Sequence, residues 1–248
     1  MGLTFSANLG FLWQELPLPD AIRAAKAAGF AAVECHWPYD VPAQDVAAAL
    51  RDTGLPMLGL NTRRGAPGQN GLSALPGRGA EARAAVDEAL AYADAVDARA
   101  VHVMAGFATG EAAEDAFVET LAYACAATER MILIEPLNAY DAPGYFLTTT
   151  AQAEHIIARV GAPNLRLMFD CYHVQLMEGD VTRKLERLLP LIGHIQFASV
   201  PDRGVPDHGE LNYPHVFNVI DGMGWDLPLG AEYKPAGATE PTLGWLAR

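Results

Sequence analysis

Short apolar stretches alternate along the chain with longer alanine-rich segments. The stretch MILIEP is typical of the short ones, because four apolar residues precede Glu135 and a proline. A strand covered on both faces has this unbroken apolar character, whereas a half-exposed strand alternates apolar and polar residues. Pro136 cannot donate a ladder hydrogen bond and favours extended backbone at Glu135, so the strand is expected to end there. The same reasoning predicts eight strands, at Leu3–Asn8, Ala32–Cys35, Met57–Asn61, Ala100–Ala105, Met131–Glu135, Leu165–Asp170, His194–Ala198 and Gly230–Tyr233.

The alanine-rich segments have the spacing and the end signals of helices. In the first, Pro19 suits the opening turn, and Gly29 followed by Phe30 is typical of a Schellman ending. Little chain follows the last strand, so the eighth helix is expected to be short or missing. Longer helices are predicted at Ala80–Val96, Ala112–Ala127, Ala151–Val160 and Val181–Leu189.

Strands that alternate with helices favour parallel β/α units, and eight of them predict a single (β/α)8 TIM barrel over residues 1–248. Chains of ~250 residues are ordinary for this α/β fold, and a closed barrel leaves no exposed sheet edge. The stretch from Thr62 to Gly79 is rich in Gly, Pro and Arg and is long for a loop, which favours an active-site flap over a linker.

Composition and charge narrow the function classes. Hydrophobic residues make up 51% of the chain and charged residues 19%, and the formal net charge is -13. That charge would repel a phosphate backbone, so no nucleic acid partner is expected. No apolar run approaches the ~20 residues that span a bilayer, and the N-terminus shows no leader, so a cytoplasmic protein without a membrane partner is expected. The three cysteines are widely spaced, which favours free buried thiols over disulfides. The oligomeric state stays open, a homo-oligomer included.

Polar residues with an oxygen ligand stand at the ends of four successive predicted strands: Glu135, Asp170, Gln196 and Glu232. Neighbouring strands end side by side in a barrel, so these side chains can converge. Three carboxylates and an amide oxygen form a hard donor set that suits Mg²⁺ or Mn²⁺ better than zinc or copper. A polar strand end can also merely cap a helix or meet water. We expect a divalent metal site because all four residues occur together on adjacent strands.

Histidines near the same strand ends have roles that the sequence leaves open. His173 follows Asp170 by three residues and can face the same cavity or cap a helix. His102 lies in an apolar strand and His36 follows one, so each suits either the core or a substrate contact. His194 begins a strand, which favours a structural role.

Arginines in two loops are candidates for binding an anionic substrate. Arg203, after the seventh predicted strand, is the stronger candidate, and Arg63 and Arg64, after the third, are the alternatives. A solvated loop is the other interpretation of all three side chains.

Several longer stretches carry a resemblance to a known family. They are AAKAAGFAAVE, GLSALPGR at 71–78, VHVMAG at 101–106, FDCYH at 169–173, HIQFASVPDR at 194–203, GELNYP at 209–214 and EYKP at 232–235. By these stretches the chain resembles, over nearly its full length, the hydroxypyruvate isomerase family of the xylose isomerase-like barrels. The resemblance implies proton transfer by Glu135 and Glu232. It also implies metal ligation by Glu135, Asp170, Gln196 and Glu232, and substrate contacts at His173, Arg203 and Glu210.

Three departures from the family pattern concern segments around the pocket. Ala66 follows Gly65 where the family usually has an acidic residue, Gly204 and Val205 replace a His-Glu pair, and MGWDLPLG precedes the last strand. The first two bear on the identity of the substrate more than on the chemistry.

We therefore expect a metal-dependent isomerase of the aldose–ketose type that acts on a small 2-oxo acid or sugar acid, such as hydroxypyruvate converted to tartronate semialdehyde. A 2-oxo-tetronate isomerase or a ketose 3-epimerase on the same scaffold is the nearest alternative. A lyase or endonuclease of the superfamily is less favoured, because no histidine-rich site or basic face is visible. A barrel that binds a sugar acid without turnover is the remaining alternative.

Overall fold

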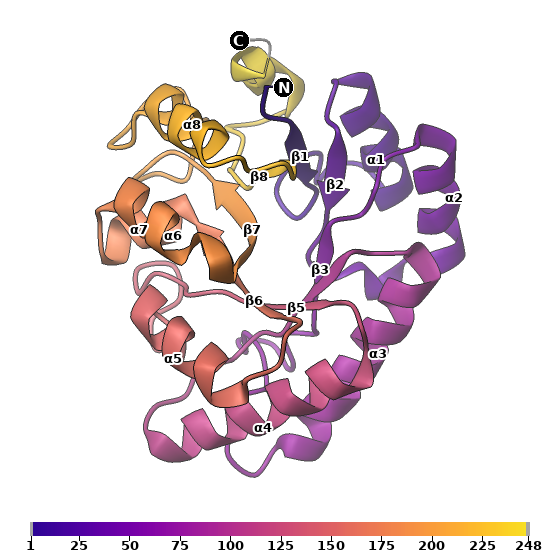
Figure 1. The fold of residues 1–248 in the computed structure, drawn as a ribbon. Coiled ribbons are helices and arrows are strands. Elements are labelled where there is room, and N and C mark those ends of the chain that lie inside the picture. The colour runs from indigo at the N-terminus through magenta and orange to yellow at the C-terminus, as the bar shows by residue number, and fades with distance from the viewer. Residues whose placement is uncertain (1, 247–248) are drawn as a thin grey trace.

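Eight parallel strands form a nearly closed barrel in the computed structural model, which describes residues 2–246 (Figure 1). The strands are β1 (Phe5–Asn8), β2 (Ala32–Glu34), β3 (Gly59–Asn61), β4 (Ala100–His102), β5 (Met131–Ile134), β6 (Leu165–Asp170), β7 (Ile192–Phe197) and β8 (Leu229–Ala231). They pair in the order β2-β1-β8-β7-β6-β5-β4-β3. Val33 of β2 forms a parallel bridge with Met57, just before β3, and so brings the two ends of the sheet together. The predicted TIM barrel is confirmed.

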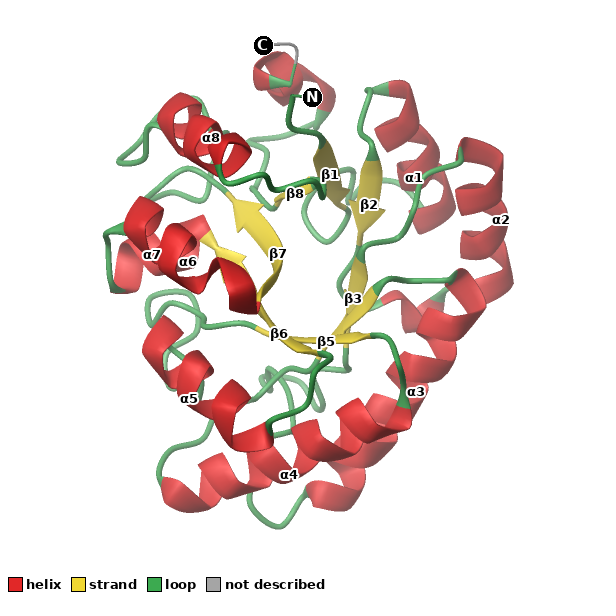
Figure 2. Cartoon of the chain, in the orientation of Figure 1, coloured by secondary structure: helices red, strands yellow, loops and turns green. Residues whose placement is uncertain are grey.

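Helices surround the strands on the outside (Figure 2). They are α1 (Leu18–Ala27), α2 (Ala43–Thr53), α3 (Gly79–Val96), α4 (Glu111–Ala127), α5 (Thr150–Val160), α6 (Cys171–Met177), α7 (Val181–Leu188) and α8 (Tyr213–Gly222). Short 3₁₀-helices η1 (Pro38–Asp40) and η2 (Leu189–Leu191) precede α2 and β7. After β8, the described residues form only the 3₁₀-helix η3 (Glu240–Trp245), as predicted for the end of the barrel. Within residues 2–246, no helix has the length and apolar character needed to cross a membrane.

The end of α1 has the predicted Schellman form. The Phe30 N–H donates to the Ala25 carbonyl at 3.1 Å, and the Gly29 N–H donates to the Lys26 carbonyl at 3.1 Å. These two bonds satisfy carbonyl groups that would otherwise lack partners at the helix end. The chain returns to the barrel at once, because β2 begins at Ala32.

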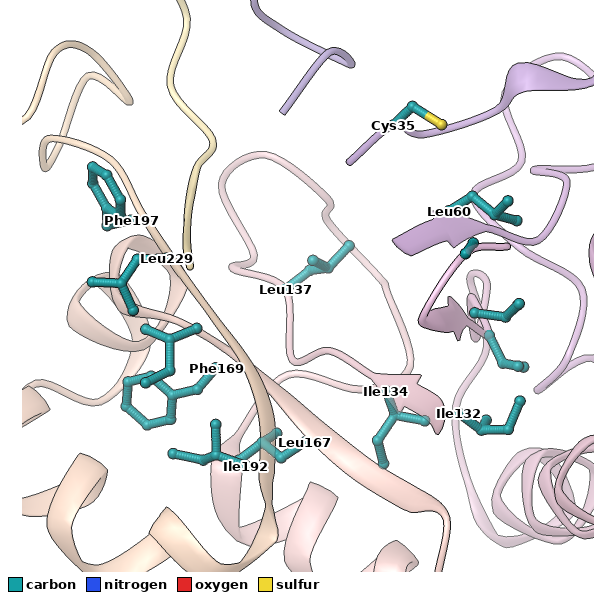
Figure 3. Packing of buried hydrophobic residues seen from close by; sticks show 14 of the residues in the cluster. Cys35, Leu60, Ile132, Ile134, Leu137, Leu167, Phe169, Ile192, Phe197 and Leu229 are labelled. Atoms are coloured by element: carbon teal, nitrogen blue, oxygen red, sulfur yellow. The ribbon is translucent and has the colours of Figure 1, made fainter. Parts of the chain in front are cut away.

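Successive side chains of a strand point alternately outward, into an apolar layer under the helices, and inward, into the barrel interior. In β6, Leu167 and Phe169 belong to the main core between strands and helices, and Figure 3 shows them packed with residues of neighbouring strands. Met168, between them in the sequence, packs instead with Ala100 and Leu133 in a separate group. Successive residues of a strand point to opposite faces, so Met168 marks the positions that face the interior.

The loop between β3 and α3 forms backbone hydrogen bonds with the residues that follow β4. The Ala74 N–H donates to the Ala105 carbonyl at 2.7 Å. β4 ends at His102, earlier than the predicted Ala105, because the residues beyond it pair with this loop. Arg64 and Asn70 of the loop line the cavity at the barrel mouth.

Candidate active site

A cavity of about 370 Å³ opens at the carboxyl ends of the strands. Active sites of TIM barrels lie at this end, because the loops that follow the strands surround it. The ionisable groups in its inner wall are those of Glu135, Glu232, His36, His102, His173 and Arg203.

The four predicted metal-ligand residues reach this region from adjacent strands. Glu135 follows β5, Asp170 ends β6, Gln196 lies in β7 and Glu232 follows β8, and all four are buried. Asp170 lies two positions after Met168 and therefore faces the interior, and Gln196 is its register partner in the sheet. Carboxylate oxygens of Glu135, Asp170 and Glu232 lie within 4.8 Å of one another. The structure thus brings the three predicted carboxylates together.

Three buried oxygens in this group have no hydrogen-bond partner among the described residues: Glu135 Oε1, Asp170 Oδ2 and Gln196 Oε1. Buried polar atoms are nearly always paired, so an unpaired group of them requires an explanation. A divalent cation supplies one, because it neutralises clustered carboxylates and takes oxygen ligands. The residues present therefore fit the predicted metal, and the buried cluster could hold one.

The three carboxyl groups differ in proton affinity. Burial, followed by the charges of Glu232 and Asp170, raises the pKa of Glu135 well above its usual range. Burial and the Glu232 charge raise the pKa of Asp170 to about 8. Burial acts in the same direction on Glu232, but Arg203 and His36 outweigh it and hold the pKa of that carboxyl below its usual range. Without a cation, Glu232 is therefore ionised at neutral pH while the other two carboxyls favour their protonated forms.

Glu232 is surrounded by polar groups from three segments of the chain. Arg203 Nη2 donates to Oε2 at 2.6 Å, Asn8 Nδ2 donates to Oε1 at 2.9 Å, and His36 Nε2 lies 3.0 Å from Oε1. Asn8 ends β1, and His36 follows β2. These contacts fix the position of the carboxylate and favour its ionised form.

Arg203 forms ion pairs with carboxylates of the protein itself. Its guanidinium lies between two rings, with Cζ 4.7 Å from the centroid of Phe11 and 5.0 Å from that of Tyr172. Besides the bond to Glu232, its Nη1 lies 3.5 Å from Asp141 Oδ2. Its Nε is buried without an acceptor among the described residues. The structure places Arg203, the predicted anion-binding candidate, in the cavity wall, but its two Nη groups already face acidic side chains.

His173 lies beside the carboxylates. The Asn138 backbone N–H donates to His173 Nδ1 at 3.0 Å. Burial and the charge of Arg203 lower the pKa of His173 to about 3, so the ring is neutral at physiological pH. Nε2 lies 3.3 Å from Arg203 Nη2 and 3.5 Å from Asp170 Oδ2. A ring nitrogen of His173 lies within 4.8 Å of the three carboxylates, so His173 and Gln196 are both candidates for the fourth ligand.

Beneath the carboxylates, Glu34 orients the amide of Gln196. Gln196 Nε2 donates to Glu34 Oε2 at 3.2 Å, and His194 Nε2 lies 2.7 Å from the same oxygen. Gly230 makes room for this group, because a Cβ there would lie 2.2 Å from Glu34 Oε1 and 2.8 Å from Gln196 Cγ. The amide nitrogen is used by Glu34, which leaves Gln196 Oε1 as the atom able to bind a cation.

His102 faces Glu135. Its Nδ1 lies 3.7 Å from Glu135 Oε2, and neither ring nitrogen has a hydrogen-bond partner among the described residues. Burial lowers the pKa of His102 to about 4, so the ring is neutral at physiological pH. A neutral, unpaired imidazole in the wall of a cavity is available for a substrate contact, which is one of the two roles that the sequence leaves open.

Some side chains of the site lie outside the predicted set. Asn8 and Glu34 end β1 and β2, so the strand-end rule would include them, although the prediction uses only the four later strands. Asp141, which accepts from Tyr172 Oη at 2.9 Å, lies in an irregular loop and carries no signal in the sequence.

Glu210, predicted as a substrate contact, does not reach this cavity. Its side chain is exposed, and its Oε2 accepts from Gln175 Nε2 at 3.3 Å. It lines a separate groove beside α8. The structure therefore does not bring Glu210 together with the other predicted substrate contacts.

Comparisons with known proteins identify the family. The family model described as xylose isomerase-like TIM barrel matches residues 22–248. The 2-oxo-tetronate isomerase of Cupriavidus necator is 44% identical, and the match covers 98% of this chain and 96% of that protein. The hydroxypyruvate isomerase of Escherichia coli is 37% identical over 98% of each chain. The crystal structure of "AP endonuclease, family 2" from Brucella melitensis is 41% identical with a TM-score of 0.95, and covers 99% of this chain and 98% of that one.

Both of these isomerases match the chain over nearly its full length. The family model and the barrel agree with the resemblance carried by the motifs. The chain is therefore an isomerase of the aldose–ketose type and belongs to the hydroxypyruvate isomerase family of the xylose isomerase-like TIM barrels.

Proposed function

We propose that this isomerase uses Mg²⁺ or Mn²⁺ to convert hydroxypyruvate to tartronate semialdehyde through an enediolate. The observation that carries the proposal is the buried group of Glu135, Asp170 and Glu232, whose oxygens converge at the strand ends and are partly unpaired. The substrate class is supported by the hydroxypyruvate isomerase of Escherichia coli, which the chain matches from end to end.

Glu135, Asp170, Gln196 and Glu232 would hold the metal through oxygen atoms, a donor set that favours Mg²⁺ or Mn²⁺. When bound, the cation polarises the substrate's carbonyl and offsets the negative charge that develops on its oxygens. His173, which lies in the cavity wall beside the carboxylates, contacts a substrate oxygen and helps to orient it.

Two glutamates transfer the proton between carbon atoms. Glu232, kept ionised by Arg203 and His36, accepts the proton that leaves carbon 3 of hydroxypyruvate. The electron pair of that C–H bond forms the carbon–carbon double bond of the enediolate. Glu135 donates its proton to carbon 2, and the hydroxyl proton of carbon 3 moves to the oxygen on carbon 2. Proton exchange with water then returns Glu232 to its ionised form and Glu135 to its protonated form. The pKa of Glu135 is raised and that of Glu232 is lowered, as an acid and a base acting as a pair require. Because both would bind the same metal, their titrations are coupled.

2-Oxo-tetronate is the second candidate substrate, because the Cupriavidus necator relative named for its isomerisation is 44% identical. It is also a 2-oxo acid and needs the same proton transfer, with one more carbon atom to accommodate. A cavity of about 370 Å³ has room for acids of three or four carbons.

A nucleic acid substrate is poorly supported, although one similar structure carries an endonuclease name. The net charge of -13 opposes binding of a phosphate backbone. The candidate ligand set consists of carboxylates and an amide, whereas a nuclease of this superfamily would need a histidine-rich zinc site. A direct turnover assay with neutral ketoses decides whether the isomerase also accepts a substrate without a carboxylate.

Changing each glutamate to glutamine tests the proposed roles. Glu135→Gln and Glu232→Gln should each lower kcat for the 2-oxo acid substrate by at least about 10²-fold, because each removes a proton-transfer group. Glu210→Gln is the matched control, since that exposed residue lies outside the cavity and should keep normal kinetics. Turnover close to that of the unchanged protein in Glu232→Gln would refute its assigned role.

A further inference from the structure

Three cationic side chains line the cavity: Arg64, Arg203 and Lys234. A substrate carboxylate needs a cation that the protein's own acids leave available. Arg203 already bonds to Glu232. Lys234 is exposed, and its Nζ lies 5.9 Å from the centroid of the Phe11 ring, so little restrains it. Arg64 differs from both.

Arg64 is held in a defined orientation. Its Cζ lies 4.5 Å from the centroid of the Trp37 ring, and its Nε donates to Asn70 Oδ1 at 3.2 Å. Asn70 is itself buried, with 8% of its surface exposed. The Arg64 carbonyl accepts from the Gly71 N–H at 2.8 Å, which fixes the backbone. Stacking and the Nε bond set the plane of the guanidinium and leave its two Nη groups for a ligand.

The neighbouring arginine shows a different arrangement. Arg63 lies over the Tyr39 ring, and its Nε lies 2.6 Å from Glu88 Oε2 in an exposed ion pair. Arg63 does not line the cavity, whereas Arg64 does. No carboxylate among residues 2–246 forms an ion pair with Arg64. One arginine of this loop thus completes a surface ion pair, and the next presents an uncompensated charge to the cavity.

We propose that Arg64 binds the carboxylate of the substrate and thereby selects 2-oxo acids over neutral ketoses. At the inner end of the cavity Arg203 is already paired with Glu232, whereas Arg64 lies on the exposed loop at the mouth without such a partner among residues 2–246. An acid is therefore oriented with its carboxylate at Arg64 and its carbonyl and hydroxyl toward the carboxylates of the protein. The planar guanidinium can hold both carboxylate oxygens at once. For the reaction itself, the inference rests on the proposed function.

Binding of a stable substrate mimic tests the inference without turnover. D-Glycerate and glyceramide differ only in that a neutral amide replaces the carboxylate, and calorimetry on Mg²⁺-loaded protein gives the affinity for each. Arg64→Gln should weaken glycerate binding about 10- to 100-fold, the range expected for hydrogen bonds to a charged group, and leave glyceramide unchanged. Arg64→Lys keeps the positive charge but loses the planar guanidinium that can bind both carboxylate oxygens. Its affinity for glycerate should lie between those of the unchanged protein and Arg64→Gln.

Arg63→Gln is the matched control, and it should bind glycerate as the unchanged protein does. Normal glycerate affinity in Arg64→Gln would overturn the inference, as would a loss of affinity in Lys234→Met that Arg64→Gln does not share. Steady-state kinetics give a second test. Arg64→Gln should raise KM for hydroxypyruvate and not for dihydroxyacetone, the neutral ketose with the same carbon chain.

The two proposals can fail separately. If neither 2-oxo acid is turned over while glycerate binding still depends on Arg64, the carboxylate site stands and the proposed reaction is wrong. If hydroxypyruvate is turned over with unchanged KM in Arg64→Gln, the reaction stands and the role of Arg64 is wrong.

Discussion

At the residue scale, the chemistry of the site depends on which atom of each side chain faces the cavity. An amide presents either oxygen or nitrogen, and an imidazole presents either a protonated or a bare nitrogen. Glu34 takes the nitrogen of Gln196, and Asn138 donates to Nδ1 of His173. Residues outside the carboxylate group therefore leave Gln196 Oε1 and His173 Nε2 as the atoms that face the carboxylates.

Removing Glu34 should weaken metal binding without touching a ligand. In Glu34→Leu the amide of Gln196 loses its restraint, so the Kd for Mn²⁺ should rise about 10- to 100-fold, as found for residues that orient metal ligands. Glu34→Gln keeps an acceptor oxygen and should recover most of the affinity. Mn²⁺ titration by electron paramagnetic resonance gives both constants. An unchanged Kd in a folded Glu34→Leu protein would show that the contact has no orienting role.

Metal binding should release protons at neutral pH. The pKa of Asp170 is raised to about 8 and that of Glu135 is also raised, so below that pH a cation must displace protons from these carboxyls. Affinity for Mg²⁺ should therefore increase as the pH rises from neutral toward about 8. Calorimetry at pH 7 in two buffers of different ionisation enthalpy counts the released protons. Binding without proton release would mean that these carboxyls are already ionised in the metal-free protein.

At the scale of elements, the loop between β3 and α3 is held at the barrel mouth by close backbone contact. Gly71 has φ 116° and forms an antiparallel bridge with Ala105. A Cβ at Gly71 would lie 2.4 Å from the Met104 carbonyl oxygen, closer than real Cβ atoms approach. The position of Arg64 therefore depends on a glycine several residues away.

Gly71→Ala should destabilise the protein by more than about 2 kcal/mol, because the left-handed backbone and the clash with Met104 both oppose a side chain. It should also raise KM for the 2-oxo acid, because the loop that carries Arg64 must shift. Gly77→Ala is the control, since Gly77 has φ 80° with nothing near its Cβ position, and it should cost about 1 kcal/mol and leave KM unchanged. Urea unfolding and steady-state kinetics measure both effects. Equal behaviour of the two variants would contradict the account of this loop.

The sequence predicts the helices and strands well, but it predicts poorly the contacts between segments that are distant along the chain. β6 has the predicted bounds, because its apolar run and the Asp170 that ends it are local signals. The early end of β4 is not predictable in this way, because it depends on pairing between Ala105 and Gly71. The same holds for Asp141, whose contact with Arg203 arises only when the loop after β5 folds over the barrel.

The site was predictable to the extent that strand ends converge in every TIM barrel. That rule is enough to place Glu135, Asp170 and Glu232 together. The rule does not predict that Arg203 forms an ion pair with Glu232, because this contact depends on the orientation of a side chain in a loop. The choice of Arg64 over Arg63 likewise depends on which ring each one stacks on.

At the scale of the whole molecule, three buried carboxyl groups at one point oppose folding unless protons or a cation offset their charge. A ligand that binds only the folded state stabilises it by mass action. The metal is therefore expected to be part of the stability of the barrel as well as of its chemistry.

Mg²⁺ or Mn²⁺ at 100 times its Kd should raise the free energy of unfolding by about 2.7 kcal/mol, and hence the Tm by roughly 5 to 10 °C. Asp170→Asn, which replaces a ligand carboxylate, should lose most of this shift. Calorimetric scans of the metal-stripped protein with and without added metal measure it. A Tm that does not respond to either metal would contradict the metal site.

The most direct test of the central claim is exchange of carbon-bound protons with heavy water, followed by NMR on metal-stripped protein with and without Mg²⁺. We predict that the carbon 3 protons of hydroxypyruvate exchange and tartronate semialdehyde appears only when protein and metal are both present, with 2-oxo-tetronate as the parallel substrate. Exchange that is absent for both 2-oxo acids, or equally fast without metal, would contradict the claim that this barrel is a metal-dependent 2-oxo acid isomerase.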